Sequence, residues 1–90
     1  MVVKRVYYSV HFIKQLNHLP VTIISLIRRK ENIFRLNPLH PSLRLHQLKG
    51  RLTGHWSISI DLNYRLIFKR MSDGNILFIS VGKHDIYRSL

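Results

Sequence analysis

The sequence predicts an α+β fold in one domain: an N-terminal strand, a helical hairpin, and then an antiparallel sheet of three to four strands. Apolar residues recur at helical spacing between residues 9 and 36, whereas apolar and polar residues alternate from residue 43 onward, as in half-buried strands. A breaker with two prolines at residues 37–42 separates the two halves. Because 90 residues can bury one core, residues 1–90 are expected to form a single domain.

The first half is predicted to be a strand followed by two helices. Residues 2–8 are rich in β-branched and aromatic side chains, and Ser9 can cap a helix because its hydroxyl accepts a hydrogen bond from a free amide of the first turn. Pro20 ends the first helix and can open the second. The second helix carries an apolar stripe, Ile23, Ile24, Ile27 and Phe34, beside a basic run, Arg28, Arg29 and Lys30.

Alternation also sets the register of the first predicted β-hairpin. From Trp56 onward, apolar residues alternate with polar ones. A three-residue loop ending at Asn63 pairs Trp56 with Phe68 and Ile58 with Leu66, and it uses Asn63 in the left-handed conformation. A two-residue loop would place apolar residues opposite polar ones, so the three-residue loop is preferred.

The dipeptide Asp73-Gly74 predicts a tight turn into the last strand. With Ser72 paired to Asn75, Phe68 lies opposite Ile79. The predicted core face is then Trp56, Ile58, Leu66, Phe68, Leu77, Ile79 and Val81, with Arg70 as a charged misfit near the strand end. The other face carries Ser57, Ser59, Arg65, Lys69, Ser80 and Gly82, and also His84 if the strand runs two residues further.

The composition points to a polyanionic partner and excludes several kinds of site. Fifteen Lys and Arg against four Asp and Glu give a net charge of +11, which attracts nucleic acids and acidic proteins. The absence of cysteine excludes disulfides, thiolate zinc sites and cysteine nucleophiles. The histidines lack metal-ligand spacing, so no metal or cofactor is predicted. No segment is long enough to span a membrane and no signal peptide is recognised, so a cytoplasmic protein is expected.

Histidine and arginine side chains on one basic face can cleave RNA without a metal. The ribose 2′-OH attacks the adjacent phosphorus, a base takes its proton, an acid protonates the leaving 5′-oxygen, and cations stabilise the charge on the phosphorane. Histidine suits the proton transfers and arginine suits the phosphate. Position alone nominates His46, Lys49, Arg51, Arg65 and His84. The basic run on the second helix can equally be a solvated face, and Tyr87 can stack on a base or tether the chain end.

Four motifs, LHQLKG at residues 45–50, GHWS at 54–57, YRLIF at 64–68 and VGKHDIY at 81–87, resemble the RelE/ParE superfamily of bacterial toxin–antitoxin toxins. The resemblance covers nearly the whole chain. It implies a β-α-α-β-β-β microbial RNase-like fold. On the RelE, YoeB and YafQ side of the superfamily, it implies an endoribonuclease that cuts mRNA in the ribosomal A site.

The resemblance also assigns site residues. His46 matches a position that holds histidine in YafQ-like toxins and glutamate in YoeB-like toxins, Arg65 matches the phosphate-binding arginine, and His84 matches a histidine near the C-terminus. His46 is then the general base and His84 the general acid or a base contact, although the reverse is also open because Ser59 and Asn63 replace a histidine and an aspartate of the YafQ pattern. Independently of the resemblance, further RNA contacts are predicted at Lys49, Arg51, Ser59, Lys83 and Tyr87, and at Arg28, Arg29 and Lys30.

The resemblance implies a cognate antitoxin with an acidic, partly disordered segment, the ribosome and mRNA as partners, and operator DNA bound only through the antitoxin complex. Two alternatives stay open. A ParE-like DNA gyrase poison shares the fold, but such proteins generally lack the His46 and His84 positions. A non-enzymatic basic RNA- or ribosome-binding module would bind in a salt-sensitive manner without cleaving.

Overall fold

The computed structural model describes the backbone of residues 1–88 and the side chains among them except those of His84 and Arg88. Its strands are β1 (Arg5–Tyr8), β2 (His46–Gln47), β3 (His55–Ser59), β4 (Arg65–Arg70) and β5 (Asn75–Gly82), and its α-helices are α1 (Val10–Leu16) and α2 (Val21–Leu36). Four short 3₁₀ segments complete the chain: η1 (Pro41–Leu43), η2 (Gly50–Leu52), η3 (Ser72–Gly74) and η4 (His84–Arg88). The α+β prediction is confirmed.

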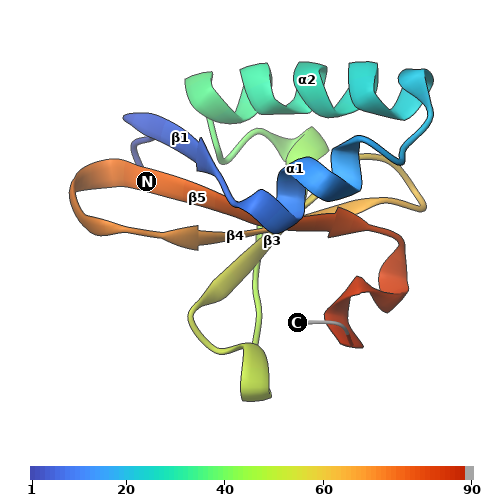
Figure 1. Ribbon diagram of the computed structural model, residues 1–90. Helices are drawn as coiled ribbons and strands as arrows, with labels where there is room; N and C mark the ends of the chain where they lie inside the picture. Colours follow the sequence, from blue (N-terminus) through green and yellow to red (C-terminus); the bar gives the residue numbers. More distant parts are fainter. Residues whose placement is uncertain (89–90) are drawn as a thin grey trace.

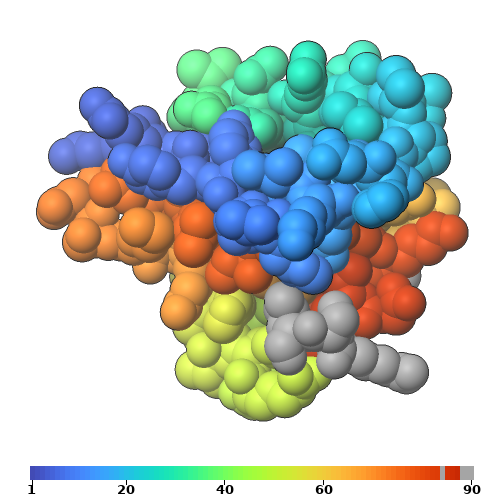
Figure 2. Space-filling model, viewed as in Figure 1, coloured from blue at the N-terminus to red at the C-terminus, as the bar shows by residue number. Residues whose placement is uncertain are grey.

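The strands form one sheet in the order β1-β5-β4-β3-β2 (Figure 1). The antiparallel part consists of the four strands β2 to β5, as predicted, and the N-terminal strand β1 extends it by pairing in parallel with β5. Both α-helices lie on one face of the sheet, whereas η2 and η4 lie on the other (Figure 1). Figure 2 shows the segment around η2, in yellow, as a lobe that projects below the helices.

The main core lies between the α-helices and the sheet. Phe34 packs edge-on against Phe68 with ring centroids 5.0 Å apart, and Phe12 packs against Phe78 at 5.5 Å. The buried members of this core are Phe12, Ile27, Phe34, Leu43, Ile58, Ile60, Leu66, Phe68, Ile76, Phe78 and Val81. Burial of these side chains fixes the sheet against the α-helices and leaves its other face available for a site.

The predicted helix start at Ser9 is confirmed. Its hydroxyl accepts a hydrogen bond from the backbone N–H of Phe12 at 3.0 Å and donates one to the carbonyl of Ile79 at 2.9 Å. Helix α1 ends at Leu16, earlier than the predicted end at Pro20, because the chain tightens beyond it into turns such as the hydrogen bond from Leu19 N to Leu16 O. Helix α2 begins directly after Pro20, as predicted.

The register of the β3–β4 hairpin is confirmed, with Trp56 opposite Phe68 and Ile58 opposite Leu66. The left-handed conformation predicted for Asn63 is wrong, since its φ is not positive. The carboxylate of Asp61 instead accepts hydrogen bonds from the backbone N–H groups of Asn63 and Tyr64 at 2.8 and 2.7 Å. This side-chain turn closes the loop without a left-handed residue.

Arg70 lies where the register predicts, on the helix-covered face at the end of β4. Its guanidinium carbon is 5.9 Å from the ring centroid of Trp56, and its side chain is exposed. A cation over an indole ring accounts for a charged residue at the rim of the apolar face.

The register of the β4–β5 hairpin is correct in only one half. Leu66 pairs with Val81 as predicted, but Phe68 pairs with Phe78 and not with Ile79. A β-bulge shifts the register by one residue between these pairs. The bulge changes which residues reach the core: Ile76 and Phe78 are buried there, whereas Leu77 and Ile79, which were predicted to be core residues, are only partly buried.

The turn compensates for the bulge, because it is one residue longer than predicted. The N–H of Met71 donates to the carbonyl of Asn75 at 2.7 Å, so three residues form the loop. Asp73 and Gly74 adopt left-handed conformations with φ of 60° and 82°. A longer turn followed by one extra residue in β5 returns the far half of the hairpin to the predicted pairing.

Helix α1 covers the edge of β5 beyond the point where β1 ends. Strand β1 pairs with β5 only as far as Phe78. Past that residue, the side-chain oxygen of Gln15 accepts a hydrogen bond from the N–H of Val81 at 2.7 Å, and its nitrogen donates to the buried hydroxyl of Ser80 at 3.0 Å. Gln15 thus satisfies the backbone N–H of Val81, which another strand at this edge would otherwise pair.

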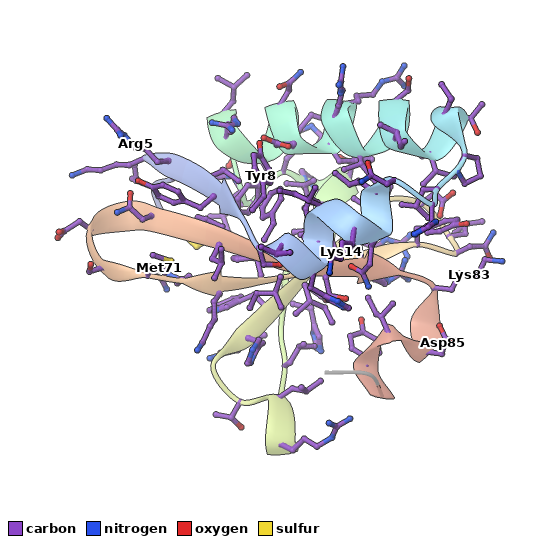
Figure 3. The ribbon with its side chains drawn as sticks, viewed as in Figure 1. Arg5, Tyr8, Lys14, Met71, Lys83 and Asp85 are labelled. Carbon is purple, nitrogen blue, oxygen red and sulfur yellow. The ribbon has the colours of Figure 1, made fainter. Side chains whose placement is uncertain are left out.

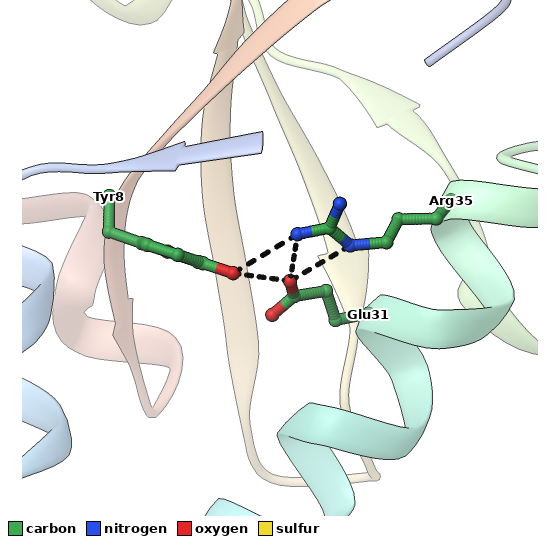
Figure 4. Close-up of polar contacts among 3 residues, drawn as sticks. All are labelled: Tyr8, Glu31 and Arg35. Carbon is green, nitrogen blue, oxygen red and sulfur yellow. Dashed lines mark hydrogen bonds and ion pairs between the residues drawn. The ribbon is translucent and has the colours of Figure 1, made fainter. Parts of the chain in front are cut away.

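A polar cluster joins the end of β1 to α2 (Figure 4). The hydroxyl of Tyr8 donates to the carboxylate of Glu31 at 2.5 Å, and Arg35 donates to the same oxygen at 2.8 Å and to the Tyr8 hydroxyl at 3.2 Å. Burial, and next the hydrogen bond to Glu31, raises the pKa of Tyr8 above its ordinary value of 10.0. The hydrogen bond to Glu31 also raises the pKa of Arg35.

Replacing Tyr8 with phenylalanine is expected to lower the free energy of unfolding by roughly 1 kcal/mol at neutral pH. Because the folded pKa is raised, the stabilisation is fully present below pH 10.0 and is lost as the pH rises through the higher folded value. Urea unfolding of both proteins between neutral pH and strongly alkaline pH should therefore show a difference that shrinks at high pH. Tyr7→Phe is the control, because Tyr7 is similarly exposed and has no hydroxyl hydrogen bond to the described residues. A constant difference across this range would contradict the prediction.

Candidate functional site

The face of the sheet opposite the α-helices carries the predicted site in two adjacent rows. Paired across the strands, the first row is His46, Ser57, Ile67 and Ser80, and the second is Ser59, Arg65 and Gly82. His46 and Arg65 therefore share one face, two strands and two residues apart. Ideal strand spacing puts their Cα atoms about 12 Å from each other, a distance that two long side chains approaching one phosphodiester can span.

This face is less open than the alternation predicts. Ile67, which lies between Arg65 and Lys69, is fully buried, and it forms a second, smaller core with Leu48 and Ile86. Ser57 and Ser80 are buried as well. The prediction of a wholly polar face is wrong, because η2 and η4 fold back over it (Figure 1). The remaining polar surface lies around the rim of this small core.

The geometry of Arg65 is fixed by the β3–β4 loop. One terminal nitrogen, Nη1, donates to the carbonyl of Asp61 at 2.7 Å and also contacts the Ser59 hydroxyl and the Tyr64 carbonyl, each at 3.2 Å. Nε and Nη2 have no hydrogen-bond partner among the described side chains. An arginine held by one nitrogen still presents two parallel N–H donors, which is the arrangement that binds a phosphate in bidentate fashion.

Across the sheet, Arg65 on β4 lies between the strand that carries His46 and the strand that leads to His84. His46 is exposed on the edge strand β2, and its ring makes no hydrogen bond within the described part of the chain. The backbone of His84 begins η4 directly after β5. The side chain of His84 lies outside the described residues.

Several predicted RNA-contacting cations line the rim of this face. Lys49 and Arg51 are exposed at η2, and Arg51 donates a hydrogen bond to the carbonyl of Tyr87 at 2.5 Å, which ties η2 to η4. Lys83 is exposed after β5, with its ammonium 5.9 Å from the centroid of the Tyr64 ring. Tyr87 packs, partly buried, against the small core, as expected of a residue that tethers the chain end.

The basic run on α2 does not join this group. Arg28 and Arg29 are exposed on a helix that covers the opposite face of the sheet (Figure 1), and Lys30 lies on the same helix. Their prediction as RNA contacts therefore refers to a surface separate from that of His46 and Arg65. The spacing that put them on one helix face carried no information about which side of the sheet that helix would cover.

Pattern reading missed Asp61 and Ile86 as supports of the site. Asp61 closes the loop that anchors Arg65, by accepting hydrogen bonds from the backbone N–H groups of Asn63 and Tyr64. An aspartate at the start of a predicted turn is the sequence signal that could have identified it. Ile86 packs against Gly82, and a Cβ added to Gly82 would lie 2.2 Å from Cγ2 of Ile86. Both contacts depend on how the chain returns across the sheet, which local alternation does not encode.

The described residues contain no group of three or more His, Asp or Glu that could hold a metal ion, and none of their helices is long and apolar enough to cross a membrane. Their one ion pair joins Arg35 to Glu31, on the helix-covered side. Among the described residues, Lys49, Arg65 and Lys83 therefore form no ion pair with a carboxylate.

Solved structures with a similar fold include bacterial and archaeal toxins. The solved YoeB/ParE toxin from Agrobacterium tumefaciens is 15% identical, with a TM-score of 0.76 over 90% of this chain and 99% of that one. A RelBE2 toxin–antitoxin complex from Mycobacterium tuberculosis is 19% identical, with a TM-score of 0.76 over 92% and 100% of the two chains. An archaeal RelE–RelB complex from Pyrococcus horikoshii is 20% identical, with a TM-score of 0.73 over 92% and 96%. At these identities the likeness establishes the fold.

Sequence comparison establishes the family. No curated protein matches the sequence significantly. The model of the HigB-like toxin family, described as RelE-like toxins of type II toxin–antitoxin system HigB, matches residues 8–84. That match spans both α-helices and all strands from β2 to β5, and it confirms the resemblance to RelE/ParE toxins. The chain belongs to the HigB-like family of RelE-like type II toxins.

Proposed function

We propose that this toxin is a ribosome-dependent, metal-independent endoribonuclease that cleaves mRNA and so inhibits translation. The observation that carries the proposal is the placement of His46 and Arg65 on one sheet face, with two N–H donors of Arg65 unused by the described residues. A histidine can act as the general base for 2′-OH attack, and a bidentate arginine can stabilise the charge that develops on the phosphate. The surrounding surface is basic, which suits a polyanionic substrate.

In the proposed reaction, His46 takes the proton of the ribose 2′-OH as its oxygen attacks the adjacent phosphorus. Arg65 binds the non-bridging oxygens and stabilises their growing charge, with Lys49 and Arg51 adding positive potential. The bond from phosphorus to the 5′-oxygen breaks, and His84 donates the proton that this oxygen takes. The products are a 2′,3′-cyclic phosphate and a free 5′-hydroxyl, and exchange of the two histidine roles gives the same balance.

Two kinds of partner follow from the charge. Ribosomal RNA is a polyanion that can hold a protein of net charge +11 beside the message and position the scissile phosphate. Solved structures with this fold include toxin–antitoxin complexes of RelE with RelB and of YoeB with YefM. We propose a cognate antitoxin with an acidic segment that neutralises the same surface, and operator DNA bound through that complex.

The test is to add antitoxin-free toxin to programmed ribosomes and to map new 5′ ends on a defined mRNA. Cuts within the A-site codon are expected. His46→Gln keeps the approximate size of the side chain, but an amide cannot act as a general base. It should lower the cleavage rate by about 10²- to 10⁴-fold. His46→Glu should retain part of the activity, because a carboxylate can also take the proton of the 2′-OH.

His11→Gln is the matched control, since His11 is an exposed histidine on α1, away from the site. It should cut at the wild-type rate. An intact message in every reaction would contradict the proposal. Inhibition of supercoiling by purified gyrase would then favour a ParE-like poison, whereas salt-sensitive RNA binding without cleavage would favour a binding module.

A further inference from the structure

A hollow lies at the end of the sheet where β3 turns into β4, on the side next to α2. Its volume is about 520 Å³. It is lined by Leu26 and Lys30 of α2, by Pro41, Ser42 and Arg44 around η1, and by Ser59, Ile60, Asp61 and Leu62 of the loop. Nothing in the proposed reaction uses this hollow.

The hollow has the chemical lining that a nucleotide needs. Lys30 and Arg44 supply two cations, and neither has an ion-pair partner in the described structure. The one carboxylate in the lining, that of Asp61, has an oxygen committed to two backbone N–H groups at 2.7 and 2.8 Å. The exposed side chain of Leu62 adds apolar surface beside these charges. Cations suit a phosphate, and apolar surface suits the ribose and base.

Arg44 is held in a conformation that its side chain disfavours. Its φ and ψ are 47° and 52°, the left-handed region in which a Cβ is crowded by the backbone and glycine is preferred. The Arg44 side chain is exposed and makes no hydrogen bond with the residues that the structure describes. Neither burial nor pairing accounts for an arginine at this position, whereas binding an anion in the hollow does.

The hollow adjoins the proposed cleavage site through one side chain. Ser59 lines the hollow, and its hydroxyl accepts the hydrogen bond from Nη1 of Arg65 at 3.2 Å. A strand with one phosphate on Arg65 therefore passes the loop and reaches the hollow with a neighbouring nucleotide. We infer that Lys30 and Arg44 form a second phosphate-binding subsite for a flanking nucleotide of the single-stranded message. The identity of the strand rests on the proposed function.

The test measures binding of a labelled, 2′-O-methyl single-stranded RNA of about ten nucleotides by fluorescence anisotropy at several salt concentrations. This probe has no 2′-OH and cannot be cleaved, so the result is independent of whether the toxin is a ribonuclease. Each phosphate contact to single-stranded RNA contributes about 0.7 to the slope of log K against log salt concentration. Arg44→Gly should reduce the magnitude of the slope by that amount, and Arg44→Gly with Lys30→Gln by about twice as much.

Three comparisons separate this subsite from other effects. Arg44→Gly should melt at the wild-type temperature or above, because glycine relieves the left-handed strain, whereas a structural role for Arg44 would lower it. Arg44→Lys keeps the charge and should keep the slope. Arg5→Gln removes one charge from β1 and should leave the slope unchanged. Figure 3 shows Arg5 at the far end of the molecule from Lys83, which lies beside Tyr64 at the β3–β4 loop and so marks the end of the molecule with the hollow. Equal slopes for Arg44→Gly and wild type, equal losses for Arg44→Gly and Arg5→Gln, or no measurable binding would overturn the inference.

Discussion

Replacing Arg65 with alanine is expected to lower the rate of mRNA cleavage on programmed ribosomes by about 10²- to 10³-fold. The geometry of Arg65 is fixed by several hydrogen bonds, through Nη1 to Asp61, Ser59 and Tyr64. A preorganised donor stabilises the charge of the phosphorane without reorganising during the reaction. The assay is the initial rate of appearance of the cut 5′ end, measured with saturating ribosomes.

Two variants separate this role from general effects of charge and folding. Arg65→Lys keeps the charge but loses the two parallel donors, so it should recover only a small part of the lost rate. Lys69→Ala removes an exposed cation from the same face of the same strand and should stay within about twofold of wild type, as expected for charge that only attracts RNA. Wild-type cleavage by a folded Arg65→Ala protein would remove Arg65 from the mechanism.

Replacing Gly82 with alanine is expected to lower the free energy of unfolding by about 1–3 kcal/mol, the usual cost of overpacking. The backbone of Gly82 is not left-handed, so alanine is tolerated there in itself. The added Cβ, however, would stand 2.2 Å from Cγ2 of Ile86, so η4 must move away from the sheet. Because Lys83 and Tyr87 move with that segment, cleavage should fall by about 10²-fold as well. Urea unfolding and the ribosome assay measure the two effects.

The double variant Gly82→Ala with Ile86→Ala tests the cause. Ile86→Ala alone removes a buried side chain from the small core and should be destabilising by about 2 kcal/mol or more. If the clash with Ile86 is responsible, the double variant should be more stable than the sum of the single effects by about 1 kcal/mol or more, since truncation makes room for the new methyl group. Strict additivity would show that Gly82 matters for another reason.

The fold followed from the sequence wherever one local pattern determined it. The alternation around Ile58 fixed the β3–β4 register because only one loop length keeps apolar residues on one face. The prediction for the β4–β5 hairpin was half wrong because of a bulge at Ile79, in a stretch of β5 that hydrogen-bonds to Ser9 and Gln15, far away in the sequence. A contact between residues far apart in the chain leaves no periodic signal in either segment.

The candidate site was also only partly predictable from the sequence. Alternation was enough to place Arg65 on the polar face of its strand, because strand parity carries a side chain to a definite side of the sheet. The presence of His46 on that face follows from the pairing of β2 with β3, which alternation did not predict. It did not reveal that Ile67 on that face would be covered by Ile86, or that α2 would carry Arg28 and Arg29 to the other side. Those outcomes depend on the path of the loops and of the chain after β5.

The pairing of β1 with β5 sets the order in which the molecule can form. Ser9 reaches across 70 positions of sequence to Ile79, and every backbone partner of β1 in the sheet lies between Asn75 and Phe78. During synthesis, the N-terminal strand and α1 therefore wait without their sheet until β5 has left the ribosome, and contacts of such long range also slow folding. The toxin acquires the interior strand β5 last, so a partially made chain has neither a finished sheet nor the row that holds Arg65 beside Gly82.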